Sequence, residues 1–337
     1  MRAYAYVDNI SLDHLRPVEL PDPEPGPRDV VVRIRAVALN FRDLAIARGA
    51  YHVGVSPPLV PLSDGAGEVV AVGPEVTRAS VGDLVCPVYL PDWIDGDVSP
   101  RVARRRLGGP SDGVLAEFVC LHEDEVVRAP SHLSAEEAAT LPVAAVTAWQ
   151  ALHRTSHVRP GDNVLVQGAG GFSGAAIQLA SAAGARVISV TRSDHHKKAL
   201  RQLGAADVIV SSGGTDEMAR KIVSMTDGLG AEAVLDVAGG ESLNRSIAST
   251  RMGGHVHLVG YAADKVASID IFQAIRHAVT VHVATAGSRE SFEALTRAMA
   301  FRRLRPPVGR LFKATEIHVA FDALGKGGGF GKLVLTL

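Results

Sequence analysis

Residues 163–174 read Asn-Val-Leu-Val-Gln-Gly-Ala-Gly-Gly-Phe-Ser-Gly, and this stretch decides the fold. Its first residues have the apolar pattern of a buried strand, and the small and apolar residues of 175–184 continue it as a helix. Gly168 permits a tight turn, while Gly170 and Gly171 let backbone N–H groups approach a pyrophosphate at the positive end of that helix. The stretch therefore predicts a dinucleotide clamp.

The glycine pattern departs from the usual fingerprint at one position. Ser173 stands where the third glycine is expected, and Gly174 follows one place later. A serine hydroxyl can itself bond a phosphate, so the departure is compatible with nucleotide binding. A plain structural turn is the alternative reading, but a second strand pattern at 185–190 completes the strand-helix-strand unit that dinucleotide binding requires.

Length, composition and charge limit the classes of function. The chain has 337 residues, enough for about two domains, with 47% hydrophobic and 21% charged residues and a net charge of −1. Because no basic stripe is present, we expect no nucleic-acid partner. No apolar run approaches the ~18 residues of a membrane span, and no signal peptide is recognisable, so we expect a cytoplasmic protein. Cys86 and Cys120 lie too far apart to indicate a disulfide framework or a cysteine-rich metal site.

The pattern along the chain predicts an α/β protein with two domains. Residues 1–130 alternate short Val/Ile runs with Pro/Gly turns, as in a β-barrel. Helical patterns begin at a capping box formed by Ser134 and Glu137. A doubly wound parallel sheet is then predicted from strands near 163–167, 185–190, 207–210, 232–236, 254–259 and 279–284, alternating with helices near 173–183, 194–203, 215–226 and 241–250. A helix at 289–301 and a strand at 332–337 return to the first domain, which gives domains of 1–130 with 287–337 and of 131–286.

Several short motifs in this order resemble the medium-chain dehydrogenase/reductase superfamily over essentially the whole chain. They are Leu39-Asn-Phe-Arg-Asp-Leu, Arg48-Gly-Ala-Tyr, Asp64-Gly-Ala-Gly-Glu-Val-Val, Val81-Gly-Asp, Gly113-Val-Leu-Ala-Glu-Phe, Ala145-Val-Thr-Ala-Trp and Phe330-Gly-Lys. The chain looks most like the zinc-independent branch of quinone oxidoreductases, enoyl reductases and zinc-free alcohol dehydrogenase-like proteins. The resemblance implies a GroES-like barrel domain, a Rossmann domain and an NAD(P)-dependent oxidoreductase.

The resemblance also implies chemistry without a metal. Zinc-dependent relatives hold catalytic zinc with Cys and His-Glu ligands, because a tetrahedral site needs soft or imidazole donors. The corresponding positions here are Asn40, Ser63-Asp64 and Pro142, and residues 87–119 lack the four cysteines of a structural zinc lobe. We do not expect His195-His196 to bind metal, because this pair opens a solvent-facing helix. We do not expect it of His255-x-His257 either, because that pair lies along a strand without a cysteine or carboxylate partner.

The end of the second strand of the predicted Rossmann domain indicates the cofactor. Where NAD-specific sites place an acidic residue, this chain has Thr191-Arg192-Ser193, with Lys197 one helical turn later. Arginine can fork onto a 2′-phosphate, so we expect NADPH. The alternative is that Ser193 or Asp194 only caps the next helix and Arg192 is solvated. By resemblance we expect further cofactor contacts at Asn40, Thr147, Phe172, Val259, Gly260, Tyr261, Phe330, Gly331 and Lys332.

Tyr51 is the candidate catalytic residue, because a similar Gly-x-Tyr segment carries the proposed proton donor in related enoyl reductases. The alternative, that Tyr51 only lines the cleft, has equal weight. The predicted function is NADPH-dependent hydride transfer to an activated C=C bond (enone or enoyl) or a quinone. Zinc-free interconversion of a carbonyl and an alcohol is the alternative reaction, and a nucleotide-binding protein without turnover is a third reading. An uncharged edge strand near 280–284, together with the resemblance, predicts a homodimer.

Overall fold

The computed structural model describes residues 1–51, 54–211 and 215–337 and divides into two compact units. The first comprises Met1–Val146 and Ala286–Leu337, and the second comprises Thr147–Thr285. Residues 131–146, which the sequence pattern grouped with the nucleotide-binding domain, cluster with the first unit. The predicted α/β class, with a barrel-type sheet and a doubly wound parallel sheet, is confirmed.

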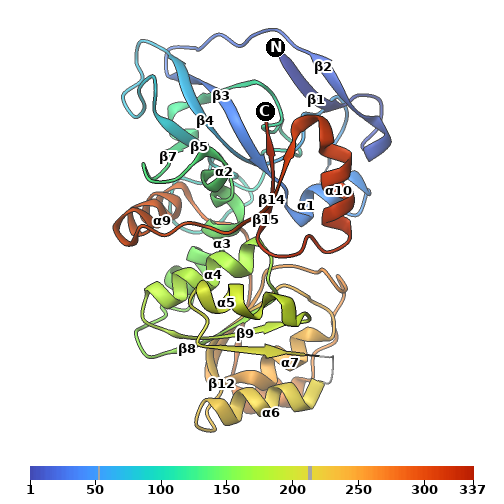
Figure 1. Ribbon diagram of the computed structural model, residues 1–337, viewed down its shortest axis with the longest axis vertical. Coiled ribbons are helices and arrows are strands. Elements are labelled where there is room, and N and C mark those ends of the chain that lie inside the picture. The colour runs from blue at the N-terminus through green and yellow to red at the C-terminus, as the bar shows by residue number, and fades with distance from the viewer. Residues whose placement is uncertain (52–53, 212–214) are drawn as a thin grey trace. The chain divides into compact units, whose positions relative to one another are not determined.

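The first unit is built on a seven-stranded sheet (Figure 1). Its central strand, β3 (Asp29–Ala38), pairs antiparallel with β4 (Asp64–Val72), β6 (Phe118–His122) and β15 (Lys332–Thr336). Most β3 side chains are buried, because both faces of the strand are covered. The other strands are β5 (Leu84–Pro87), β7 (Val126–Arg128) and β14 (Val308–Lys313), and a separate hairpin consists of β1 (Arg2–Tyr6) and β2 (Leu15–Glu19).

The C-terminal segment adds β14 and β15 to this sheet, and β15 lies next to β3 near the candidate site. Ala38, at the end of β3, is the register partner of both Asp64 in β4 and Val334 in β15. The first residues of β4 and β15 therefore lie beside the point where β3 ends. The chain then enters α1 (Phe41–Ala47), which begins at Asn40. The remaining helices of the unit are α2 (Ala135–Ala138), α9 (Arg289–Arg302) and α10 (Ile317–Gly325).

The second unit contains six parallel strands in the order β10-β9-β8-β11-β12-β13. This order places the first strand in the middle and reverses the direction of winding there, as in dinucleotide-binding folds. All six predicted strands are present, as β8 (Asn163–Gln167), β9 (Arg186–Thr191), β10 (Asp207–Val210), β11 (Ala231–Asp236), β12 (Thr250–Leu258) and β13 (Thr280–Val283). The predicted helices correspond to α4 (Gly171–Ala182), α5 (Lys197–Gln202), α6 (Thr215–Met225) and α7 (Ser242–Ser249).

Three helical segments differ from the sequence pattern. No helix is predicted from the sequence at α10 or at α8 (Ile271–His277), whose start is capped by the Asp270 side chain accepting from the Gln273 N–H. The helix that links the two units is irregular, because α3 (Val146–Trp149) is flanked by π-helical turns at Leu141–Ala145 and Gln150–Thr155. No helix in the described part of the chain is long and apolar enough to cross a membrane.

Candidate active site

A buried ammonium group organises the end of β3 in the first unit. The Lys332 Nζ donates to Leu39 O at 2.9 Å, to Asn40 Oδ1 at 2.6 Å and to Asp64 Oδ2 at 3.1 Å. Its three hydrogens are thereby used within the protein. Burial raises the pKa of Asp64, while the Lys332 charge and the Asn40 amide act to lower it. The sequence brought Asn40 and Lys332 forward as cofactor contacts, and the structure joins them directly, with Asp64 as a further acceptor of Lys332.

The first turn of α1 is tied to the same cluster. The Asp43 carboxylate accepts the Asn40 backbone N–H at 2.7 Å, which caps the helix. Burial raises the pKa of Asp43 to about 6, although the neighbouring Arg42 guanidinium lowers it in part. Asn40 is therefore fixed twice, by its backbone through Asp43 and by its side chain through Lys332.

Tyr51 lies beside a second buried cation. The Arg42 guanidinium carbon is 5.4 Å from the centre of the Tyr51 ring and 4.9 Å from that of the Tyr89 ring. Arg42 and Tyr89 are buried, and Tyr51 is partly exposed. The sequence singled out Tyr51 as a site residue, but neither Arg42 nor Tyr89. His52 and Val53, which follow Tyr51, lie outside the described residues.

The glycine-rich turn of the second unit has the geometry of an anion cradle. Gly168 has φ +86°, a conformation that glycine adopts without strain. Gly170 precedes the first residue of α4, and a Cβ built on it would meet no atom within 4 Å. No side chain caps the helix at Gly170, so its first N–H groups are available to an anion. Gly171 and Phe172 form the first helical positions.

Ser173 has a different role from the one suggested by the sequence. Its hydroxyl donates to the Gln167 carbonyl oxygen at 2.6 Å and is buried. A serine hydroxyl has one hydrogen, so this bond closes the strand-to-helix turn instead of reaching a phosphate. The backbone of the turn remains the donor for an anion.

The residues expected to recognise the 2′-phosphate lie at the end of β9. Arg192 is exposed and makes no ion pair with the described residues. Ser193 makes no side-chain capping bond, whereas Lys197 pairs with Asp194 at 3.0 Å. The Arg192 guanidinium is therefore the more available cation, and the charge of Lys197 is partly neutralised.

The ends of neighbouring strands complete this edge of the sheet. Val259 follows β12 and donates its N–H to Asp236 O at the end of β11, and Gly260 and Tyr261 come next. The buried Asp236 carboxylate accepts from Ala238 N at 2.9 Å and Ser246 Oγ at 2.7 Å. In parallel strands the carboxyl ends share one edge, so the clamp, Arg192 and residues 259–261 belong to the same edge. The sequence pattern did not single out Asp236, which shapes this edge.

The remaining predicted contacts lie at element boundaries. Thr147 is buried in α3 and is the first residue of the second unit. Phe330 and Gly331 precede β15 in the first unit, and Gly331 has φ +71° with Pro307 O 2.7 Å from a built Cβ. Only glycine fits this position, because β14 and β15 approach closely there.

The residues at the positions of zinc ligands do not fit a zinc ion. They supply an amide, a hydroxyl and a carboxylate, and the Lys332 ammonium group already binds the Asn40 and Asp64 oxygens. A metal cation there would meet a like charge instead of thiolate or imidazole donors. In the described part of the chain, no group of three or more His, Cys, Asp or Glu side chains is arranged to hold a metal.

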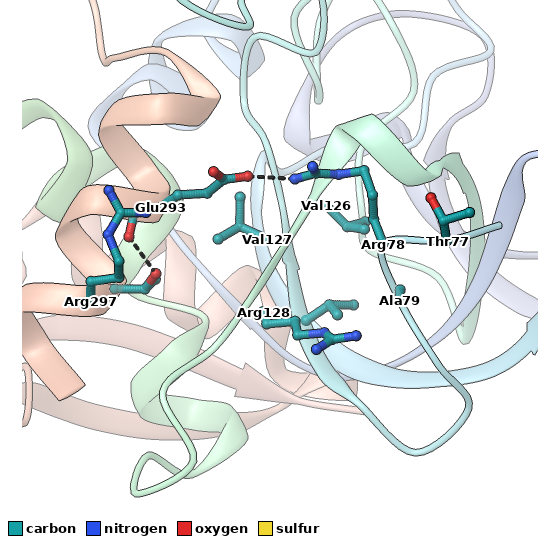
Figure 2. A pocket seen from close by; sticks show the side chains of 10 residues that line it. Thr77, Arg78, Ala79, Val126, Val127, Arg128, Glu293 and Arg297 are labelled. Atoms are coloured by element: carbon teal, nitrogen blue, oxygen red, sulfur yellow. Dashed lines mark hydrogen bonds and ion pairs between the residues drawn. The ribbon is translucent and has the colours of Figure 1, made fainter.

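A pocket of about 440 Å³ lies elsewhere in the first unit (Figure 2). Apolar side chains of β5 and β7 and polar side chains of α9 line it, and no predicted site residue does. Arg78 is paired with Glu293, as Figure 2 shows, and Arg128 is paired with Asp83 at 2.8 Å. Because these charges already have partners, we assign no ligand to this pocket.

Comparisons with known proteins agree with the geometry of both units. The family model described as alcohol dehydrogenase GroES-like domain matches residues 26–131, and the one described as zinc-binding dehydrogenase matches residues 171–300. A zinc-type alcohol dehydrogenase-like protein of Schizosaccharomyces pombe is 34% identical over 99% of this chain and 99% of its own.

Two further relatives indicate the range of activities in the group. An acryloyl-coenzyme A reductase of Metallosphaera sedula is 29% identical over 94% of this chain and 95% of its own. The crystal structure of a putative alcohol dehydrogenase from Sinorhizobium meliloti superimposes with a TM-score of 0.92 at 35% identity, covering 100% of this chain and 98% of that one.

Proposed function

The chain belongs to the medium-chain dehydrogenase/reductase superfamily of NAD(P)-dependent oxidoreductases, and we propose that it uses NADPH to reduce an activated C=C bond without zinc. The substrate class is an enone, an enoyl thioester or a quinone. The main support for a zinc-free reaction is the cluster around Lys332. Asn40 and Asp64 are at the positions expected for zinc ligands, and both bind the Lys332 ammonium group.

The absence of zinc-type ligands favours conjugated substrates on chemical grounds. A simple ketone develops full alkoxide charge when it accepts hydride, so it needs a strong electrophile at its oxygen. A conjugated carbonyl accepts hydride at the β-carbon and spreads the charge over an enolate, which needs a proton donor and modest support. The acryloyl-coenzyme A reductase relative supports this class of substrate.

The chain's own residues divide the work between binding and protonation. NADPH, when bound, supplies the hydride. The turn at Gly168 and Gly170 holds the pyrophosphate on the first N–H groups of α4, and Arg192 and Ser193 hold the 2′-phosphate. Lys332 fixes the side chain of Asn40, which we expect to be a further contact of the cofactor. Tyr51 donates its hydroxyl proton to the enolate carbon, with Arg42 beside its ring.

A matched pair of substrates tests the reaction class. We expect but-3-en-2-one to oxidise NADPH at 340 nm and to yield butan-2-one, while butan-2-one itself leaves NADPH unchanged. A quinone in the same assay measures the third substrate type. Formation of but-3-en-2-ol, or rapid reduction of butan-2-one, would replace the proposal with carbonyl reduction.

Carbonyl/alcohol interconversion is the second candidate, because two of the relatives are described as alcohol dehydrogenases or as similar to them. The same assay run in reverse, with NADP⁺ and a series of alcohols, measures it. If that reaction uses zinc, elemental analysis must find about one zinc per chain and chelation must abolish turnover. We expect neither, since the donor set around Lys332 suits an ammonium group.

We also propose a homodimer formed through the edge of the second unit's sheet. β13 is the last strand of that sheet, and its four residues carry no Asp, Glu, Lys or Arg. α8, which precedes β13 in the chain and packs against β12, exposes Phe272 (75%) and Ile275 (71%), and Val283 of β13 is 76% exposed. An identical strand related by a two-fold axis would pair with β13 and cover these side chains.

Sedimentation velocity tests the dimer. We expect a species of about twice the 35.4 kDa chain mass at micromolar concentration. Phe272→Glu should shift it toward the monomer, because a buried unpaired carboxylate is costly. The control is Phe301→Glu, since Phe301 is 83% exposed but lies on α9 in the first unit. A wild-type monomer would overturn the proposal.

A further inference from the structure

A guanidinium group stands between two phenol rings beside the proposed proton donor, and the reaction described above does not yet use it. Arg42 is 8% exposed, and its guanidinium carbon lies 5.4 Å from the Tyr51 ring centre and 4.9 Å from the Tyr89 ring centre. Burying a cation in this way is costly unless other groups compensate its charge. The burial of the Arg42 guanidinium beside Tyr51 and Tyr89 therefore indicates a role for this group.

Arg42 is held rigidly in place. Its Nη1 donates to Leu107 O at 3.1 Å and lies 3.3 Å from the Asp43 carboxylate, and its Nη2 donates to Gly109 O at 3.0 Å. The Nε hydrogen is buried and has no partner among the described residues. The two carbonyls are neutral and Asp43 also caps α1, so the guanidinium charge is only partly satisfied. The group can stabilise another negative charge that forms nearby.

Tyr89 is suited to keep its own proton while it supports a neighbour. It is 6% exposed, and burial raises its pKa well above the ordinary range. The Arg42 charge lowers the pKa of Tyr89 in part, and the neighbouring Tyr51 raises it. A phenol that stays protonated remains a hydrogen-bond donor, and the rings of Tyr89 and Tyr51 lie near the same Arg42 guanidinium.

We propose that Arg42 and Tyr89 act as positioning residues that make Tyr51 an effective acid, by stabilising the phenolate that Tyr51 becomes when it protonates the substrate. In this step the Tyr51 O–H bond breaks, a C–H bond forms at the enolate carbon, and the electron pair stays on the phenolate oxygen. Water then restores the proton. The inference rests on the proposed function, because it requires Tyr51 to be the donor.

Tyr89→Phe is the central test, because it removes one hydroxyl and keeps the ring against Arg42. Tyr89→Phe lacks the hydroxyl that would donate to the Tyr51 phenolate. A hydrogen bond to a charged group is the stronger kind, so the variant loses stabilisation mainly when the phenolate forms. We therefore expect kcat to fall about tenfold or more, with NADPH affinity unchanged. The alkaline limb of the kcat profile should move to higher pH, since the ionised form of the acid is less stabilised. Tyr4→Phe removes a phenol hydroxyl from β1 of the same unit and should do neither, because Tyr4 is not among the described residues that contact the Arg42 guanidinium.

Arg42 variants supply the second measurement. Arg42→Met should fold if the Leu107 and Gly109 carbonyls find water, and it should lower kcat more than Tyr89→Phe. Arg42→Lys keeps a positive charge and should recover part of the rate. Where Arg42→Met does not fold, Arg42→Lys and Tyr89→Phe together decide the question.

A double-mutant comparison separates this inference from the proposed function. If Tyr51 is the donor, Tyr51→Phe slows turnover, and adding Tyr89→Phe to it costs little more. If Tyr51→Phe leaves the rate unchanged, the donor assignment itself fails. If Tyr51→Phe is slow but Tyr89→Phe has the wild-type rate and pH profile, or slows the Tyr51→Phe enzyme equally, the role of Tyr89 is overturned.

Discussion

The two candidate regions of this protein are built in opposite ways. The clamp of the second unit is twelve consecutive residues in which backbone N–H groups are offered to an anion. The cluster of the first unit joins three residues that are far apart in sequence, Asn40, Asp64 and Lys332, through a buried charge. The first depends on conformation and the second on electrostatics.

This difference determines how each region responds to substitution. A backbone cradle tolerates side-chain changes but fails when a glycine must leave its conformation. A buried ion pair tolerates little at either partner, because removing one leaves the other charged and desolvated. Substitutions of the buried ion pair should therefore mainly lower stability, whereas substitutions in the clamp can lower nucleotide binding while the protein stays folded.

Removal of the Lys332 charge should have the largest effect on stability. Lys332 and Asp64 are 7% and 0% exposed, and they are 3.1 Å apart. Lys332→Met should lower the free energy of unfolding by about 3–5 kcal/mol, because the Asp64 carboxylate is left buried without its cation. Urea denaturation at pH 7 measures this, and adding Asp64→Asn should restore part of the loss.

Lys326→Met is the matched control. The Lys326–Asp322 pair is shorter, at 2.7 Å, but its side chains are 75% and 63% exposed. An exposed pair is worth about 0–1 kcal/mol, so this variant should keep nearly the wild-type stability. Equal losses for Lys326→Met and Lys332→Met would remove the distinction between the buried and the exposed lysine.

The pH dependence of stability should identify the second buried carboxyl. Burial raises the pKa of Asp43 from its ordinary value of 3.8 to about 6. The folded protein therefore keeps this proton at a pH where the unfolded chain has lost it. The resulting stability is full below about pH 4 and is lost as the pH rises through about 6.

Asp43→Asn isolates this contribution. An asparagine oxygen can still accept the Asn40 N–H, which preserves the cap of α1. We expect the difference in unfolding free energy between wild type and variant to change by up to about 3 kcal/mol between pH 4 and pH 7, with the wild type favoured at the acid end. A constant difference across this range would show that Asp43 titrates normally.

The sequence predicts the second unit better than the first for a physical reason. Its strands and the clamp turn follow from local patterns, since each glycine or apolar run acts on its own neighbours. The role of Lys332 was not predictable in this way, because its partners lie 268 and 292 residues away and meet only when β15 pairs with β3. The Phe330-Gly-Lys motif indicated that the position matters, but not that its ammonium group is consumed within the protein.

Other features of the structure were not predicted because they depend on contacts that form only in the folded chain. Arg42 and Tyr89 come together because Arg42 reaches the carbonyls of Leu107 and Gly109, a contact no local pattern encodes. α8 had a local signal in its Asp270 cap, but its exposed apolar side chains do not form the buried stripe that predicts a helix. The sequence suggested a phosphate as the partner of the Ser173 hydroxyl. Its actual partner, the Gln167 carbonyl oxygen, is a backbone atom, and the type of side chain at a position does not indicate such a partner.

Two glycines of the clamp should separate folding from binding. Gly168→Ala places a Cβ 3.0 Å from the Ser173 Oγ at φ +86°, so it should cost about 1–2 kcal/mol of stability. Gly170 has φ −74° and open space around a built Cβ. Gly170→Ala should keep its stability and lose about tenfold in NADPH affinity, because the methyl group enters the space of the pyrophosphate.

Thermal unfolding without nucleotide and NADPH titration by fluorescence measure the two effects. The comparison is informative because the two substitutions are chemically identical and two residues apart. If Gly170→Ala binds NADPH as tightly as the wild type, the cradle does not hold the pyrophosphate.

The smallest expected effect concerns the choice between the two cofactors. Arg192 is exposed and makes no ion pair among the described residues, so its guanidinium can fork onto a 2′-phosphate. We expect NADPH to bind about tenfold more tightly than NADH, a difference of about 1.4 kcal/mol, and Arg192→Ala to remove most of it. NADH affinity should not change, because NADH has no phosphate at that position.

Two controls distinguish a specific contact from general charge. Arg201→Ala removes an exposed arginine from α5 and should leave the preference intact. Lys197→Ala should have a smaller effect than Arg192→Ala, since Lys197 already pairs with Asp194 at 3.0 Å. The preference should also decrease with added salt, because both partners are exposed and ions screen their attraction. Equal dissociation constants for NADPH and NADH in the wild type would instead show that the 2′-phosphate is not recognised.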